Sequence, residues 1–258
     1  FIMFKYWTLL HIMLIENKSS LNRRIKSKRY TKNDKDYFKF LQNIEKKITS
    51  TEAIFQFGLY IGEENLARYL TFYDLYKKTL FLRGNCCDVG TWKGSSFLFI
   101  AKLIKIFEPY SRTKVYGFDW FKGQEPTAKD DQYFKGMHKS SYVELSNNIK
   151  KLKLQKYTVL KKIDVSKNLS KYIKLNPWLE FKYAFIDCGS SDVLESAIKN
   201  IWPKIVQGGI LVLDHAGLKN SPYESQIVRK FIGNNKIEQL SFSGHPSAYV
   251  IKKFRWYV

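Results

Sequence analysis

Aspartates recur where apolar, strand-like segments of this chain end: Asp88, Asp119, Asp164, Asp187 and Asp214. Helix-like stretches separate these segments, a pattern typical of a parallel sheet covered by helices. In such a sheet the carboxyl ends of the strands form one edge, and ligands bind there. A single aspartate after a strand is an ordinary turn or cap residue. Five along one edge favour a ligand-binding site with several carboxylates.

Residues 84–96, GNCCDVGTWKGSS, predict a strand, a tight turn and the start of a helix. Gly90 and Gly94 follow Asp88 at the spacing Asp-x-Gly-x-x-x-Gly, and glycines at such positions let the backbone turn sharply and approach a ligand closely. An acid stands where a dinucleotide-binding turn has its first glycine. This suits a cofactor without a pyrophosphate, such as S-adenosylmethionine (SAM). Alone the pattern is weak, because an ordinary tight turn needs the same glycines.

The elements that must position these residues follow from apolar periodicity. In the helix expected over 63–80, Leu66, Tyr69, Leu70, Tyr73 and Tyr76 recur at three- and four-residue steps. Further helices are expected near 97–104, 139–151, 193–201 and 223–232. Strands are expected at the segment before Asp88 and at 114–119, 157–162, 183–187 and 210–214, with two more β-rich segments at 236–243 and 247–254.

The composition is that of a globular and strongly basic chain. Lys and Arg number 44 against 23 Asp and Glu, a net charge of +21. Such a charge suggests acidic partners, or simply the lysine drift of an AT-rich genome. The three cysteines lie inside apolar segments without metal-site spacing, which argues against a disulfide scaffold and for a reducing compartment. We therefore expect a cytoplasmic protein.

The first 50 residues differ from the rest and are expected to form an apolar segment and a basic arm, with the main domain at 51–258. Residues 1–15 are apolar but too short to span a bilayer, and Lys5 and His11 interrupt them. No signal-peptide cleavage site follows. This segment reads as a packing or dimerisation helix. From Lys18 to Lys47 there are eleven basic residues and three acids, so the arm is either solvated or a contact to nucleic acid or a membrane surface.

The series DVGTWKGSS, VYGFDWFKGQEP, KKIDVS, AFIDCGSSDVLESA and PKIVQGGILVLDHAG resembles class I SAM-dependent methyltransferases. More narrowly, it resembles the macrocin O-methyltransferase group, which includes deoxy-sugar 3-O-methyltransferases. The resemblance extends over about residues 63–253. It includes ENLARYLTFYDLYKKTL before this series, and SPYESQIVRKFI and SFSGHPSAYVIKK after it. It implies an α/β, Rossmann-like fold: a mostly parallel seven-stranded sheet with helices on both faces, here with a basic helical N-terminal extension.

The resemblance also implies roles for individual residues. Asp88, Gly90, Gly94 and Ser95 would contact the methionine part of SAM. Asp119 would accept hydrogen bonds from the ribose hydroxyls, and Asp164 and Val165 would line the adenine.

A divalent metal, Mg or Mn, is implied at Asp187, Asp214 and His215, where the family uses three carboxylates. The sequence departs from the family there: Asp187 is followed by Cys-Gly-Ser-Ser rather than a second acid, and His215 replaces one member of an acidic pair. Two carboxylates and one imidazole favour a softer ion than Mg²⁺. Either a metal is retained, or His215 serves as a plain base. Asp187 is the first candidate for base and ligand, and His215 the second.

The expected reaction is SAM-dependent O-methylation of a sugar, a nucleotide-sugar or a glycosylated small molecule, by a homo-oligomer. The loop 120–140 would cover the acceptor. The lysines of this loop either bind a diphosphate of the acceptor or are ordinary surface residues; they are Lys122, Lys129, Lys135 and Lys139. His138, in the same loop, either reaches the acceptor or lies at the surface. Two alternatives stay open. A nucleic-acid methyltransferase would explain the charge, although no Asn-Pro-Pro-Tyr-type motif is present, and a non-catalytic SAM-binding protein would explain the altered metal acids.

Overall fold

The computed structural model describes residues 21–22, 24–26, 31–44, 47–128, 130–132, 135–217 and 222–253. The apolar segment 1–15 lies outside these ranges. The chain divides into two units, Phe1–Leu66 and Ala67–Val258. In the first, the longer described elements are helices α2 (Lys32–Ile44), α3 (Ser50–Phe55) and α4 (Phe57–Tyr60). The Tyr37 hydroxyl donates to the Tyr60 carbonyl at 2.7 Å. The expected helical N-terminal extension is therefore present.

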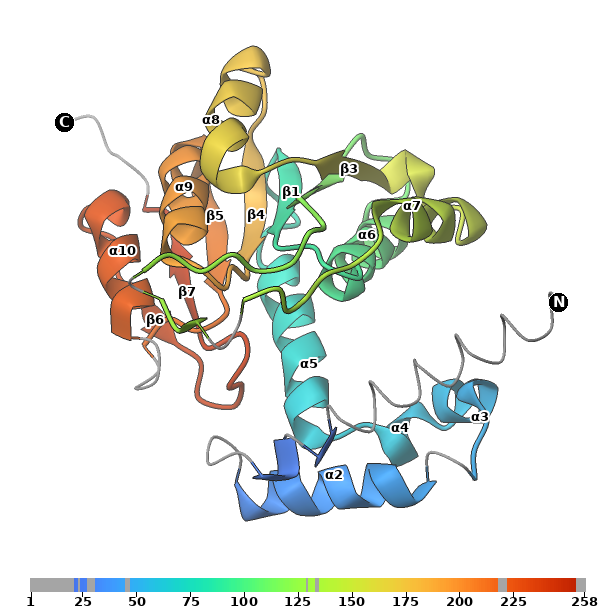
Figure 1. Ribbon diagram of the computed structural model, residues 1–258. Coiled ribbons are helices and arrows are strands. Elements are labelled where there is room, and N and C mark those ends of the chain that lie inside the picture. The colour runs from blue at the N-terminus through green and yellow to red at the C-terminus, as the bar shows by residue number, and fades with distance from the viewer. Residues whose placement is uncertain are drawn as a thin grey trace, which may run out of the picture. The chain divides into compact units, whose positions relative to one another are not determined.

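The second unit contains one seven-stranded sheet (Figure 1). The strands are β1 (Asn85–Val89), β2 (Val115–Asp119), β3 (Thr158–Lys162), β4 (Phe181–Ile186), β5 (Ile205–Leu213), β6 (Glu238–Gln239) and β7 (Ala248–Ile251). Their order is β3-β2-β1-β4-β5-β7-β6. The first five strands run parallel, β7 is antiparallel to β5, and β6 is antiparallel to β7. This confirms the mostly parallel sheet.

Helices cover both faces of the sheet. They are α5 (Glu63–Lys77), α6 (Ser95–Phe107), α7 (Tyr142–Lys151), α8 (Val165–Leu175), α9 (Ser191–Ile201) and α10 (Pro222–Ile232), with 3₁₀ turns at Gln155–Tyr157 and Trp202–Lys204. Buried side chains of α8, α9 and α10 form one apolar cluster with the sheet, and those of α5, α6 and α7 form the other. Side chains that alternate along β4 contribute to both clusters, since Tyr183 and Phe185 face one side while Ala184 and Ile186 face the other.

The buried face of α5 differs from the one expected. Phe72 and Leu75 are buried together with Tyr76, whereas Leu70 and Tyr73 are 51% and 37% exposed. Aromatic and aliphatic residues occur all around this helix, so more than one stripe satisfies a helical period. Helix α8 was not predicted from the sequence. Its buried residues, Val165, Leu169 and Ile173, form a narrow stripe on a helix that also carries three lysines.

A buried ion pair joins β4 to the end of α6. Lys182 is the extra residue of a bulge in β4, since Asn85 pairs with Phe181 and Cys86 with Tyr183. Its side chain is fully buried, and its Nζ lies 2.6 Å from Oε1 of Glu108. The same carboxylate accepts a short hydrogen bond from Tyr76. An ammonium at this depth requires that partner.

We therefore expect Glu108→Ala to lower the free energy of unfolding by about 3 kcal/mol, because it leaves the Lys182 ammonium buried and uncompensated. Denaturant unfolding followed by circular dichroism measures this. The control is Glu195→Ala, whose ion pair with Lys230 has both side chains exposed and should cost less than about 1 kcal/mol. Equal losses in the two variants would show that Lys182 does not depend on Glu108.

Candidate functional site

Asp88 lies within β1, and its side chain is completely buried. Neither carboxylate oxygen has a hydrogen-bond partner among the described residues. Burial raises the pKa of this carboxyl to about 6, although the nearby hydroxyls of Ser96 and Thr91 act to lower it. A buried carboxylate with unused acceptor positions is rare, and it can receive a donor from outside the chain. The ammonium of SAM, which the resemblance implies here, would be such a donor.

The two glycines of the turn are required by the fold itself. Both have a φ of +89°, a conformation that side chains rarely adopt. A Cβ at Gly90 would collide with the backbone carbonyl of Asp187, and one at Gly94 with the side chain of Leu145. Gly90 therefore brings the β1 turn directly against the end of β4.

Asp119 ties the same turn to the loop after β2. Its Oδ2 accepts from the backbone N–H of Trp92 at 2.7 Å, and its Oδ1 accepts from that of Phe121 at 2.6 Å. Burial raises the pKa of Asp119. Nearby, the hydroxyls of Ser95 and Tyr69 are 2.6 Å apart. Asp119 and Ser95 are thus both anchored beside the glycine turn.

Asp164 and Val165, the residues expected at the adenine, have local structural roles. Asp164 is the N-cap of α8 and accepts from the Ser166 hydroxyl at 2.8 Å and the Lys167 N–H at 3.3 Å. These donors hold its pKa below the usual range, although burial acts in the other direction. Val165 is buried in the core. Their contact with adenine stays a prediction.

Arg68, which sequence reasoning missed, joins the carboxylates at the ends of β4 and β5. Its guanidinium lies 2.8 Å from Oδ1 of Asp214 and 3.3 Å from Oδ2 of Asp187. Ile186 and Leu213 pair in the sheet, so the two aspartates that follow them are neighbours. A lone arginine among the apolar residues of α5 was the available signal.

The two aspartates differ in protonation behaviour because their surroundings differ. Burial and the Asp214 charge raise the pKa of Asp187, against the effect of Arg68. Burial also acts to raise the pKa of Asp214, but the hydrogen bond with His245 and the charge of Arg68 outweigh it and hold that pKa well below its usual range. Asp187 is therefore the stronger base of the pair.

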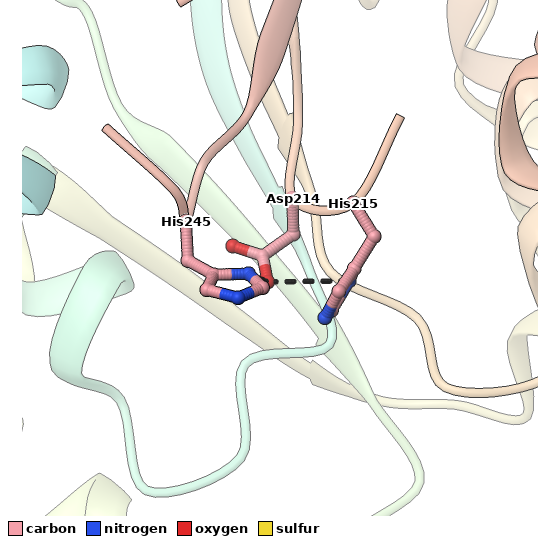
Figure 2. A group of neighbouring side chains, drawn as sticks. All are labelled: Asp214, His215 and His245. Carbon is pink, nitrogen blue, oxygen red and sulfur yellow. Dashed lines mark hydrogen bonds and ion pairs between the residues drawn. The ribbon is translucent and has the colours of Figure 1, made fainter. Parts of the chain in front are cut away.

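Asp214 also lies between two histidines. The Nδ1 atoms of His215 and His245 each lie 3.3 Å from its Oδ2, and Figure 2 shows both imidazoles directed toward the carboxylate. The buried Glu224 accepts from the backbone N–H of His215 at 3.3 Å. His245 was also missed, because it stands in a Ser- and Gly-rich segment that reads as a loop.

This arrangement does not suit the metal set that the resemblance implies. Of Asp187, Asp214 and His215, the structure brings the last two together with His245, while Asp187 pairs with Arg68. Mg²⁺ demands oxygen ligands in octahedral geometry. A guanidinium on both carboxylates and two imidazoles offer the wrong surroundings for Mg²⁺.

The loop after β2 rests on the segment where this sequence departs from the family. Asp130 accepts from the backbone N–H of Ser191 at 3.1 Å and from its hydroxyl at 3.2 Å. The Gln124 side chain fills the space where Gly189 would carry a Cβ. Lys129 lies outside the described residues. The His138 ring meets Trp92 edge-on, with centroids 5.2 Å apart.

Residues 87–216, half of the chain, match the family model of a methyltransferase domain. No curated protein matches the chain. Among the described residues, we found no helix of the length and hydropathy needed to cross a membrane.

Solved structures with the same fold include two of CalS11. One, a calicheamicin methyltransferase, is 20% identical with a TM-score of 0.73, covering 89% of this chain and 95% of its own. The other, described as a TDP-rhamnose 3′-O-methyltransferase in calicheamicin biosynthesis, is 20% identical with a TM-score of 0.68 and coverages of 89% and 97%. The O-methyltransferase NovP is 13% identical, with a TM-score of 0.61 and coverages of 73% and 80%. These likenesses establish the fold.

Removing Arg68 should destabilise the domain. We expect Arg68→Ala to lower the free energy of unfolding by roughly 2–3 kcal/mol, since two adjacent carboxylates lose their cation; the partial exposure of Asp187 limits the loss. The matched control, Arg83→Ala, removes an exposed arginine and should change stability by less than about 0.5 kcal/mol. A loss no larger than that of the control would show that the carboxylates do not need Arg68.

Proposed function

The chain belongs to the methyltransferase-domain family and is a SAM-dependent methyltransferase, and we propose that it methylates a hydroxyl of a sugar or nucleotide-sugar. The observation that carries this proposal is the state of Asp187. Its side chain is 34% exposed, Arg68 holds Oδ2, and Oδ1 has no hydrogen-bond partner among the described residues. An accessible carboxylate with a raised pKa is suited to accept a proton from a hydroxyl.

Methyl transfer to an alcohol requires alignment and removal of one proton. SAM, when bound, supplies a methyl group on a positively charged sulfur. As the acceptor oxygen takes up that methyl group, Oδ1 of Asp187 would accept the hydroxyl proton. Arg68 keeps the carboxylate oriented throughout. His215 is the second candidate for the base.

The cofactor half of the proposal is supported by the residues around the glycine turn. The orphaned carboxylate of Asp88 would receive the ammonium, with Gly90, Gly94 and Ser95 forming the turn beneath it. Asp119 has two oxygens that each accept one backbone N–H. A carboxylate oxygen has more than one acceptor position, so ribose hydroxyls can still donate to it. Asp164 and Val165 are retained as the adenine end of this site.

The acceptor class is supported by the chemistry of the base and by what the fold relatives do. CalS11 is described as acting on TDP-rhamnose, and we propose an acceptor of that class here. A sugar hydroxyl is a weak acid, so its methylation needs a base at the point of attack. The proton transfer proposed here is assigned to the Asp187 carboxylate, which pairs with Arg68.

The cofactor assignment is tested by calorimetric titration of the purified full chain with SAM. We expect binding, and we expect Asp119→Ala to weaken it about 10- to 100-fold, since hydrogen bonds to a charged acceptor are lost. Asp192→Ala is the control, because this aspartate is exposed and lies outside the turn. An absence of SAM binding by the parent chain would contradict the assignment.

The reaction is tested by transfer of labelled methyl from SAM to a panel of nucleotide-sugars, free glycosides and RNA. We expect a nucleotide-sugar to be labelled, and Asp187→Asn to lower kcat about 100-fold while SAM affinity stays unchanged. Asp192→Asn should retain activity. Labelling of RNA alone would identify a nucleic-acid methyltransferase, and SAM binding without any transfer would favour a non-catalytic protein. Either outcome would overturn the sugar assignment.

A further inference from the structure

We propose that Asp214, His215 and His245 form a site for a nitrogen-preferring divalent transition ion such as Zn²⁺, in place of the oxygen-ligated Mg²⁺ of the resemblance. One atom from each residue lies within 4.8 Å of the others. Two of the three ligands are imidazoles, which suit zinc and neighbouring transition ions and do not suit Mg²⁺. The proposal concerns ion binding and does not depend on the identity of the acceptor.

The spacing of the donor atoms fits four-coordinate geometry. Oδ2 of Asp214 lies 3.3 Å from Nδ1 of His215 and 3.3 Å from Nδ1 of His245. A tetrahedral zinc with bonds of about 2.0–2.1 Å has its ligands roughly 3.3 Å apart. Six ligands around Mg²⁺ at the same bond length would have neighbours only about 2.9 Å apart. Both distances from Oδ2 of Asp214 thus match the tetrahedral separation, and the ligand atoms of the two imidazoles lie within 4.8 Å of each other.

Arg68 and Glu224 define which atoms are offered to the ion. Arg68 occupies Oδ1 of Asp214 and pairs with Asp187, so Oδ2 alone faces the imidazoles and Asp187 is not a ligand. Glu224 accepts from the backbone of His215, which fixes the start of that side chain. Outer partners of this kind orient metal ligands.

Carboxylates lie close to the proposed ligands: Oδ2 of Asp214 and Oε2 of Glu224 are 3.3 Å and 3.8 Å from Nδ1 of His215. Three protein ligands leave a fourth position for water, as in open zinc sites.

The test is metal titration of the full chain, with any affinity tag removed and bound metal stripped by a chelator. Isothermal calorimetry should give one equivalent of Zn²⁺ bound and no heat with Mg²⁺ at the same concentration. Co²⁺ in place of Zn²⁺ should give the intense visible absorption of four-coordinate cobalt. Stronger binding of Mg²⁺ than Zn²⁺, or the weak absorption of six-coordinate cobalt, would overturn the proposal.

Variants separate this site from adventitious binding. His245→Ala should weaken Zn²⁺ at least about 10-fold. His138→Ala, which removes an imidazole elsewhere in the chain, should leave the affinity unchanged, and so should Asp187→Asn. Circular dichroism checks that each variant is folded. Zinc affinity that survives His245→Ala but is lost in Asp187→Asn would overturn the proposed ligand set in favour of the carboxylate set.

Discussion

The contact on which the rest of the site depends is the bridge from Arg68 to the aspartates that follow β4 and β5. Neighbouring parallel strands place these two carboxylates side by side. Two negative charges that are close together and partly buried repel each other strongly. A guanidinium offers several N–H donors in one plane and can serve both at once. The Arg68 guanidinium also lies 5.2 Å from the ring centroids of Phe72 and Phe185, so two aromatic rings contact the cation as well.

Backbone contacts connect this bridge to the cofactor turn. The Asp187 N–H donates to the Val89 carbonyl at 2.9 Å, and the Gly90 N–H donates to that of Phe118 at 3.0 Å. The ends of β1, β2 and β4 are therefore joined by backbone hydrogen bonds at the point where the strand order reverses, the usual place for a ligand in such sheets. Methyl transfer needs a fixed line between donor and acceptor. A hydrogen-bonded edge of this kind suits that requirement.

Most of the sheet could be predicted from the sequence, because apolar runs of strand length each end near an aspartate. The failures are of a different kind. Arg68 contacts Asp187 across 119 positions of the chain, and no local pattern distinguishes such an arginine from a surface one. His245 joins Asp214 only because β7 pairs with β5, a long-range pairing that periodicity does not reveal. Local structure was therefore readable, whereas the partners of charged groups had to be seen in three dimensions.

The segment after Asp187 anchors the loop that follows β2. Gly189 leaves room for the Gln124 side chain, and the Ser191 N–H donates to Asp130. Because Arg68 holds Asp187, the donors left for an ion are those that follow β5 and precede β7. The end of β4 is therefore tied to Arg68 and to the loop, whereas the imidazoles come from the neighbouring ends of β5 and β7, which the antiparallel pairing of these strands brings together.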